Sequence, residues 1–384
     1  MHIRIAGAGI AGLASAIALA RAGHQVSVHE QASRIEEVGA GLQLGPNAVR
    51  ALESLGAWQR LEPATVAPAA ICVHDAASDR SLSRLTLGTT FARRFGAPYR
   101  VAHRADLLNA LKAEAAALDG IEVHTGQRLT GLDLANPDKP VLRFNGEALS
   151  CDLAVAADGI RSAARQAIAA HVSPRQTGDV LYRAMCPASA LPDDIDTTNV
   201  HMWLSPGAHV VAYGVSGGKR INIVASVAGA APVDGWNALA SRDQVLSAFP
   251  SACARLRALL NEPANWLAWS AADLEPFDGW SKGHAILVGD AAHATLPHLA
   301  QGAAMALEDA VELAKHVGDG TGIAAALARF EATRKPRTSR ITLGSRTQGR
   351  IYKMSGPSAL ARNLAMKLLP ASRQLERLAW IYEG

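Results

Sequence analysis

The stretch IRIAGAGIAG, from Ile3 to Gly12, decides how this 384-residue chain begins to fold. A short apolar run leads into the pattern G-x-G-x-x-G, made by Gly7, Gly9 and Gly12, and a run of small apolar residues follows. In a strand–turn–helix unit the first glycine makes the turn, the second lets backbone amides approach a pyrophosphate, and the third lets the helix pack closely. The stretch therefore predicts dinucleotide binding; the alternative is a glycine-rich turn that only packs.

An acidic residue stands at the distance that this motif requires. The segment QVSVHE predicts a second strand and ends at Glu30, about 20 residues beyond the glycines, where a carboxylate is expected to meet a ribose hydroxyl.

Composition and charge exclude several classes of protein. Hydrophobic residues make up 49% of the chain, which indicates a globular protein, and the net charge of +4 is too small to indicate nucleic-acid binding. The four cysteines form no C-x-x-C pair, so we expect reduced thiols in a cytoplasmic protein. The chain enters a strand at once, and no apolar run reaches the roughly 18 residues of a membrane span, so neither a signal peptide nor a transmembrane segment is expected.

The next segments add a loop, a hairpin and a helix. Gly39, Gly41 and Gly45 predict a mobile or tightly turned loop before a short helix that ends at Gly56. Residues 66–90 alternate apolar and polar positions around an Asp/Ser turn and predict a hairpin. A helix then begins at Arg104, whose cation is unfavourable at a helix N-terminus unless an anion is present; Arg104 is either a pyrophosphate contact or a surface charge.

The middle of the chain returns to the first sheet and then becomes rich in strands. Residues 121–149 predict strands of the first sheet, and a buried strand before Asp158 places that carboxylate either at a ligand or in a local cap. Strands are expected between residues 176 and 275. His209 and Tyr213 alternate onto one face, which either covers a small aromatic ligand or leaves the histidine facing solvent.

The last third predicts one more buried strand and several helices. Asp290 ends the strand, Pro297 and His298 lie in a loop, and Gly302 begins a helix with an inward stripe of Leu307, Val311 and Ala314. The free amides at that helix N-terminus suit a negative oxygen on a bound ring. Residues 320–384 are expected to be helical, and the basic stretch from residue 329 to residue 353 is interpreted as a solvated face that docks on the core.

Three motifs in this order resemble those of the single-component FAD-dependent aromatic hydroxylases. They are GAGIAG with Glu30, ADGIRSAAR from residue 157, and GDAAHATLPHLAQGAAMALEDA from residue 289. The chain is similar to the salicylate hydroxylase and 6-hydroxynicotinate 3-monooxygenase type, with the para-hydroxybenzoate hydroxylase fold, over nearly its whole length. Gln43 is a departure, because the hydroxynicotinate enzyme carries a histidine there.

The resemblance implies an α/β fold in which a Rossmann-like FAD-binding domain is interleaved with a β-sheet substrate domain and followed by C-terminal helices. The expected FAD-binding domain comprises residues 1–70, 96–175 and 276–340. The expected substrate domain comprises residues 71–95 and 176–275, and a C-terminal helical segment covers residues 341–384.

The resemblance also implies roles for individual residues. The implied FAD-binding residues are Gly7, Gly9, Ala11, Gly12, Glu30, Gln31, Arg104, Leu129, Asp158, Asp290, Gly302 and Ala303. The implied substrate-binding residues are His209, Tyr213, Pro297 and His298. Of these, His298 or His209 is the candidate base, and Tyr213 a hydrogen-bonding group that orients the substrate.

The implied reaction uses NADH or NADPH as a transient co-substrate and O₂ to hydroxylate a small hydroxylated and carboxylated aromatic or N-heteroaromatic compound through a flavin C4a-hydroperoxide. No metal and no nucleic acid are expected to take part, and the protein is expected to be a monomer or homodimer. Two alternatives stay open: a related FAD oxygenase that acts on a non-phenolic substrate, and a flavin-binding redox sensor without hydroxylation.

Overall fold

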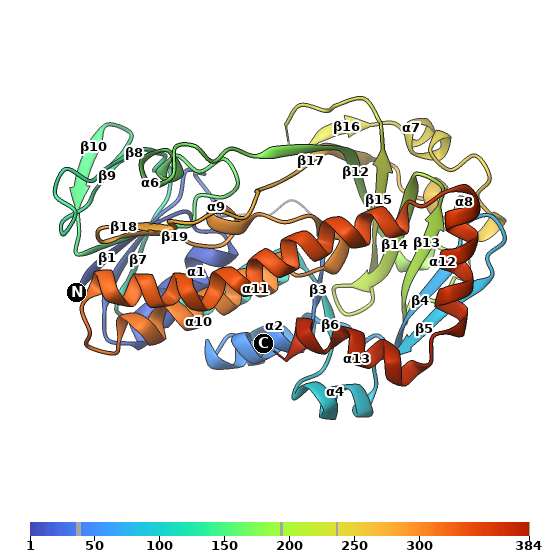
Figure 1. Ribbon diagram of the computed structural model, residues 1–384, viewed down its shortest axis with the longest axis horizontal. Coiled ribbons are helices and arrows are strands. Elements are labelled where there is room, and N and C mark those ends of the chain that lie inside the picture. The colour runs from blue at the N-terminus through green and yellow to red at the C-terminus, as the bar shows by residue number, and fades with distance from the viewer. Residues whose placement is uncertain (36–39, 193–194, 236, 384) are drawn as a thin grey trace.

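A six-stranded sheet forms one end of the molecule (Figure 1). The computed structural model describes residues 1–35, 40–192, 195–235 and 237–383. The strands, in order across the sheet, are β18 (Ser281–Lys282), β19 (Ala285–Leu287), β11 (Leu153–Ala156), β1 (His2–Ala6), β2 (Gln25–His29) and β7 (Ile121–His124). All neighbours pair in parallel except the edge strand β18. Helix α1 (Ile10–Arg21) connects β1 to β2, which confirms the predicted strand–turn–helix–strand unit.

An eight-stranded, largely antiparallel sheet forms the other end (Figure 1). Its strands, in order, are β16 (Ala238–Ala240), β17 (Trp266–Asp273), β12 (Arg175–Pro187), β15 (Arg220–Ala228), β14 (Ala208–Val215), β13 (Val200–Ser205), β4 (Ala70–Asp75) and β5 (Ser81–Thr86). The predicted hairpin of residues 66–90 is β4–β5, and the predicted strands around residues 200–228 are β13, β14 and β15. The domain boundaries drawn from the sequence stay a proposal.

Two segments differ from the prediction. Residues 129–150 do not return to the first sheet, because β8 (Leu129–Asp133), β9 (Val141–Phe144) and β10 (Glu147–Ser150) pair only with one another among the described residues. The predicted glycine loop contains a strand, β3 (Gly41–Leu44), which pairs antiparallel with β6 (Arg100–His103). Gly39 lies outside the described residues.

The remaining helices pack around the two sheets. They are α2 (Pro46–Ser54), α3 (Trp58–Leu61), α4 (Thr89–Phe95), α5 (Arg104–Ala116), α6 (Ala164–Ile168), α7 (Arg242–Ser247), α8 (Ala254–Asn261), α9 (Asp290–His293) and α10 (Gly302–Val317), with 3-10 turns at Glu62–Ala64, Ala188–Ala190 and Pro297–Leu299. Helix α10 lies against both α1 and α2. Of the predicted stripe, Leu307 is fully buried, and Val311 and Ala314 are half-buried and pack against the core; Ala310 and Leu313 are also fully buried.

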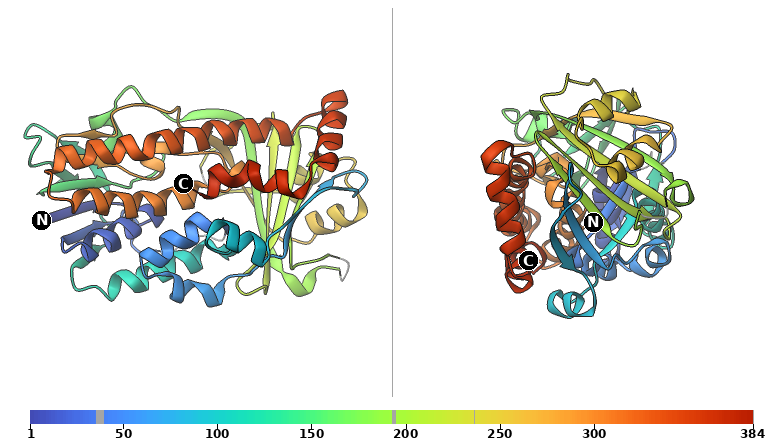
Figure 2. Two further views of the ribbon diagram at one scale, coloured as in Figure 1. Left: turned by 60° about the horizontal axis from the view of Figure 1, so that its bottom comes forward. Right: turned by 90° about the vertical axis from the view of Figure 1, so that its right-hand side faces the viewer.

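Three C-terminal helices follow α10, and the first of them joins the two ends of the molecule (Figure 1). Helix α11 (Ile323–Tyr352) runs along the long axis from the six-stranded sheet to the eight-stranded one, and α12 (Gly356–Leu368) and α13 (Ala371–Tyr382) turn back along the same side (Figure 1). All three lie on one side of the molecule, where α11 spans both sheets and α12 packs against β5 (Figure 2). Among the described residues, no helix has the length and apolarity that crossing a membrane requires.

Candidate active site

The glycine turn between β1 and α1 has two glycines that the protein's own packing requires. Gly7 has a φ of +99°, and a Cβ there would lie 2.5 Å from the carbonyl oxygen of Ala157. A Cβ on Gly12 would lie 1.8 Å from the carbonyl oxygen of Gly7, so this glycine lets the helix approach the turn itself. Both positions therefore exclude any side chain.

Gly9 is different, because a Cβ there would meet nothing within 4 Å. It is the N-cap of α1, with no side chain capping the helix, so the first amides of α1 lie beside open space. A helix N-terminus with uncapped amides suits a phosphate. The turn therefore fits a pyrophosphate.

Glu30 is hydrogen-bonded to the backbone of this turn. Its two carboxylate oxygens accept hydrogen bonds from the amides of Ala8, at 2.8 Å, and Ala32, at 2.9 Å. A carboxylate oxygen has a further lone pair available for a ribose hydroxyl. Gln31, next to it, is exposed, and Ala11 is half-buried on α1.

Asp158 supports both interpretations that the sequence left open. One carboxylate oxygen accepts hydrogen bonds from the amides of Ala163 and Ala164 and caps the start of α6. The other is buried without a hydrogen-bond partner among the described residues. A buried carboxylate oxygen normally has a partner, so a bound ligand fits here.

Arg165 fixes this segment against the start of α9. Its side chain is 1% exposed, and its guanidinium donates to the carbonyl oxygens of Ala291, Ile160 and Val172. Asp290, the first residue of α9, is exposed. The structure thus brings the segments of Asp158 and Asp290 together from opposite halves of the sequence.

The start of α10 offers free amides, as expected. Gly302 and Ala303 are half-buried, and neither the N-cap Gln301 nor an acidic first turn satisfies the helix end. Pro297, just before it, is exposed, whereas His298 is 7% exposed. Arg104 is half-buried at the start of α5, and Leu129 is buried on β8, where it pairs with Phe144. Whether these residues contact the cofactor stays a prediction.

A buried charge network behind α10 was not anticipated. Asp309 is fully buried and accepts hydrogen bonds from the Gly289 amide, His293 and Arg334. The same network continues through Glu308, which pairs with Arg334 and Arg337 of α11 and accepts a hydrogen bond from Asn47. It anchors the segment of Asp290 to the long helix.

The basic stretch is therefore not the solvated face that its charge pattern suggested. Arg334 and Arg337 pair with acids of α10, Arg346 pairs with Asp273 and Glu275, and Lys353 pairs with Asp179. The interpretation that these residues face solvent is wrong for those four, while the expected docking on the core is confirmed.

His209, on β14, and His298, in the 3-10 turn Pro297–Leu299, contact each other. Their ring centroids are 5.2 Å apart, and Tyr352, at the end of α11, lies 5.1 Å from His209. Both histidines are buried, so the alternative of a solvent-facing His209 is wrong, and the Nδ1 atom of each has no hydrogen-bond partner among the described residues. Two unsatisfied imidazole nitrogens in one buried place suit a polar ligand.

Tyr213 lies on the same face of β14 as His209, next to Gly41 and Asn222. A Cβ on Gly41 would lie 2.6 Å from the Tyr213 ring, and the Gly41 amide donates to Asn222 Oδ1 at 2.7 Å. Asn222 Nδ2 is buried without a partner among the described residues. Gln43, on the same short strand, accepts a hydrogen bond from Tyr99. Sequence reasoning missed Asn222, Tyr99 and Tyr352, since nothing in their local sequence marks them.

Burial keeps the two histidines neutral. Burial, and then the charge of Lys353, lowers the pKa of His298 to about 4, while Asp179 raises it. Burial lowers the pKa of His209 well below its usual value, with His298 and Lys353 adding to the effect. Burial likewise raises the pKa of the Tyr213 phenol. At neutral pH the site therefore offers uncharged imidazoles that can accept a hydrogen bond or a proton.

We expect acid to destabilise the protein through such histidines. His298 and His29 have a pKa of about 4 in the folded chain, against an ordinary value of 6.5. Between pH 6.5 and pH 4 the unfolded chain protonates each histidine, whereas the folded chain keeps it neutral. The free energy of unfolding therefore falls by roughly 1 kcal/mol for each of the two histidines per unit by which the pH is lowered. Urea unfolding from pH 7 to pH 4 measures this slope. His298→Gln should make the slope shallower, and an unchanged slope would contradict the assignment.

The absence of a side chain at Gly349 leaves room for the His298 ring. It lies inside the 30-residue helix α11, where glycine costs about 1 kcal/mol relative to alanine. A Cβ there would lie 2.3 Å from Cδ2 and 2.5 Å from Nε2 of His298. We therefore expect Gly349→Ala to destabilise the protein by about 1–3 kcal/mol through overpacking, despite the better helix propensity.

A double-variant cycle in thermal unfolding tests this expectation. In a His298→Ala background, Gly349→Ala should cause little or no further destabilisation, because the imidazole ring that its Cβ would meet is absent. Gly344→Ala, on the same helix, is the control: its Cβ would come no closer than 3.2 Å to Trp380. Equal destabilisation by Gly349→Ala in both backgrounds would show that the imidazole is not the obstacle.

Comparison with known proteins agrees with this geometry. The family model described as "FAD binding domain" matches residues 1–345. The chain is 37% identical to 3-hydroxybenzoate 6-hydroxylase of Klebsiella oxytoca over 383 residues, covering 100% of this chain and 96% of that one. It is 32% identical to 3-amino-4-hydroxybenzoate 2-monooxygenase of Streptomyces cremeus, covering 100% and 95%.

Solved structures give the same answer. The substrate complex of salicylate hydroxylase superposes with a TM-score of 0.85 at 27% identity and covers 100% of this chain and 95% of that one. Klebsiella pneumoniae HpxO complexed with FAD and uric acid superposes with a TM-score of 0.86 at 25% identity and covers 100% and 97%. With the glycine turn, Glu30 and the free amides of α10, these matches show that the chain belongs to the FAD-dependent aromatic hydroxylases.

Proposed function

We propose that the substrate is a small aromatic or N-heteroaromatic carboxylate that already carries a hydroxyl group, and that O₂ and NAD(P)H are the co-substrates. The observation that carries this proposal is the buried pair of His209 and His298 with unsatisfied Nδ1 atoms, beside the N-terminus of α10. The names of the relatives support a hydroxylated benzoate, and 3-hydroxybenzoate is the first compound to test.

The residues have distinct tasks in this proposal. When bound, reduced FAD supplies the activation of O₂ and the transfer of one oxygen atom to the ring. Gly302 and Ala303 present amides and the positive end of α10 to negative charge on the flavin. His298 or His209 accepts the proton of the substrate hydroxyl, which makes the ring electron-rich, and Tyr213 orients the substrate by hydrogen bonding. Burial of this cluster excludes water.

A cleft beside the Asp158 segment is a candidate site for the nicotinamide co-substrate. It measures about 300 Å³ and is lined by Arg161, Gln176, Asp179 and Ser270, among others. Exposed Arg161 could pair with a phosphate there. Arg161→Ala should raise KM for NAD(P)H and leave FAD affinity unchanged.

We also propose that the protein acts in the cytoplasm as a monomer or homodimer. Size-exclusion chromatography of the holoenzyme tests the oligomeric state.

A screen of hydroxylated benzoates and hydroxypyridine carboxylates tests the substrate class. We expect at least one compound to accelerate NAD(P)H oxidation and to gain one oxygen atom, as measured by mass spectrometry. If NAD(P)H is consumed but all oxygen appears as hydrogen peroxide with every compound, the redox-sensor alternative is favoured. A product from an aromatic compound without a hydroxyl group would instead favour the non-phenolic alternative.

A further inference from the structure

Cys72, His74 and His201 gather in the eight-stranded sheet, away from the flavin motifs. Cys72 and His74 lie two residues apart on β4 and so face the same side of the sheet, and His201 is the register partner of Cys72 on β13. All three side chains are buried, and one ligand atom from each lies within 4.8 Å of the others. His74 Nε2 and His201 Nδ1 are 3.0 Å apart.

The cluster lies on the opposite face of the sheet from the candidate active site. His201 pairs across strands with Ala212 and so shares its face, whereas the neighbouring Tyr213 faces the other way. Trp203, on the cluster's face, stacks its ring 5.5 Å from each of the two imidazoles. The cluster is therefore separate from the residues assigned to hydroxylation.

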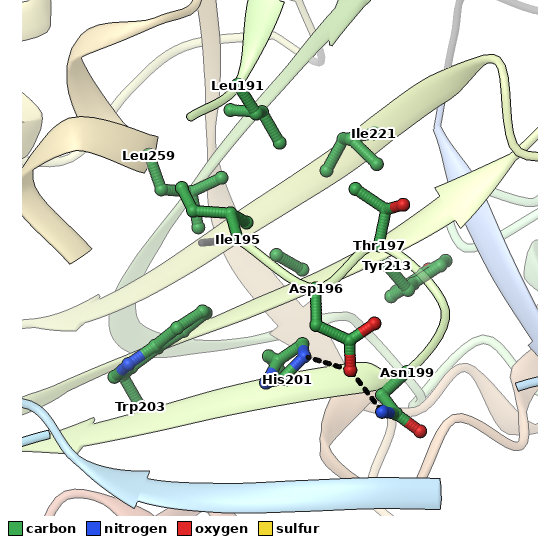
Figure 3. Close-up of a pocket in the computed structure, with 11 residues that line it drawn as sticks. Leu191, Ile195, Asp196, Thr197, Asn199, His201, Trp203, Tyr213, Ile221 and Leu259 are labelled. Carbon is green, nitrogen blue, oxygen red and sulfur yellow. Dashed lines mark hydrogen bonds and ion pairs between the residues drawn. The ribbon is translucent and has the colours of Figure 1, made fainter. Parts of the chain in front are cut away.

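The outer nitrogen of each imidazole faces a carboxylate. His201 Nε2 lies 3.6 Å from Asp196 Oδ2, an ion pair drawn in Figure 3, and His74 Nδ1 lies 4.0 Å from Asp79 Oδ1. In metal sites, a carboxylate that is hydrogen-bonded to the outer N–H of a ligating histidine leaves the inner nitrogen unprotonated. Both carboxylates here lie beyond hydrogen-bond distance, and His201 Nε2 has no hydrogen-bond partner among the described residues, so the carboxylates would approach the imidazoles when the metal binds. Here both inner nitrogens would then present lone pairs to the same point, together with the Cys72 sulfur.

A small cavity adjoins the outer side of His201. It measures about 10 Å³ and is lined by Asp196 and Trp203, among others, but by neither Cys72 nor His74 (Figure 3); it has room for about one water molecule. The point between the three ligand atoms is a separate place, and because these atoms lie within 4.8 Å of one another it suits a single ion.

We infer that Cys72, His74 and His201 bind one Zn²⁺ ion. A thiolate and two neutral imidazoles are ligands that Zn²⁺ prefers. Binding forms a Zn–S bond and releases the Cys72 thiol proton to solvent. Arg84 Nη1 donates to Cys72 Sγ at 2.9 Å, whereas burial raises the pKa of this thiol, so the thiolate forms when the metal binds. The ion would tie β4 to β13 and, through Asp196, to the segment before β13, as a structural site.

The competing explanation is a chain of hydrogen bonds without metal. Arg255 lies 3.5 Å from His74 Nδ1 and could donate to it, after which His74 donates to His201. The shorter contact of Arg255 is with Asp79, at 2.9 Å, which neutralises its charge. The two explanations differ in whether the purified protein holds a metal.

Metal titration of the full-length holoenzyme decides between them. After dialysis against a chelator, we expect Zn²⁺ to bind in one-to-one ratio by competition with a chromophoric chelator, and to raise the thermal midpoint. Co²⁺ in its place should give a thiolate-to-metal charge-transfer band. Cys72→Ser should abolish the band, and His201→Asn should weaken Zn²⁺ binding. Asp196→Asn should weaken it about 10- to 100-fold.

Two control variants separate this site from other thiols. Cys186→Ser removes another buried cysteine of the same sheet, and Cys253→Ser removes the half-exposed one; both should keep the Co²⁺ band. Folded, yellow wild-type protein that binds neither ion after chelation would overturn the inference, as would a band that survives in Cys72→Ser.

Discussion

Replacing His298 with Gln should slow product formation by about 10²- to 10⁴-fold, the usual contribution of a positioned acid–base group. His298 is buried 5.2 Å from His209, with an unsatisfied Nδ1 and a pKa of about 4. A neutral imidazole can take up the proton of a substrate hydroxyl, whereas the glutamine amide can form hydrogen bonds but cannot take up a proton. Steady-state hydroxylation, measured as product per NAD(P)H oxidised, should fall.

FAD binding should change little in the same variant, because the glycine turn expected to hold the pyrophosphate lies between β1 and α1, whereas His209 lies on β14 of the other sheet and His298 in the 3-10 turn Pro297–Leu299. His209→Gln, measured in parallel, shows which of the two histidines is the base. His284→Gln provides the matched control, since His284 lies in the turn between β18 and β19 and contacts Asp152 and Asp138. Wild-type turnover in both His298→Gln and His209→Gln would remove the pair from the catalytic assignment.

The sequence predicts well what local geometry determines. The glycine turn, the hairpin β4–β5 and the shared face of His209 and Tyr213 follow from spacing within a few residues, and the structure has all three. A strand's alternation and a glycine's positive φ need no distant partner. The same is true of the free amides at Gly302.

The errors concern distant partners. The alternation in residues 129–150 predicts strands, but not that β8, β9 and β10 form a sheet of their own. The charges of α11 predict a solvated face, because the sequence does not show that Asp309, Glu308 and Asp273 lie beneath it. Gly349 was a usable signal, since a glycine inside a long helix usually answers a packing need, and here His298 is the neighbour.

Gly9→Leu should yield colourless protein. The side chain would enter space in which the protein has no atom within 4 Å of the Cβ, and where the turn fits a pyrophosphate. A clash worth about 1–3 kcal/mol weakens binding roughly 5- to 150-fold, and the loss is larger if the phosphate cannot shift. FAD retained after gel filtration, measured from its visible absorption, gives the result.

Gly88→Leu is a closely matched control for that variant. Gly88 is the N-cap of α4 with φ −74° and ψ −160°, against φ −73° and ψ −171° for Gly9, and a Cβ there also meets nothing within 4 Å. Both substitutions put leucine at an N-cap, where it is disfavoured, so their effects on folding should be alike and only Gly9→Leu should lose the flavin. If the two variants retain equal amounts of flavin, the pyrophosphate does not occupy the open space beside Gly9. The amides of α1 would then have to bind it from another side.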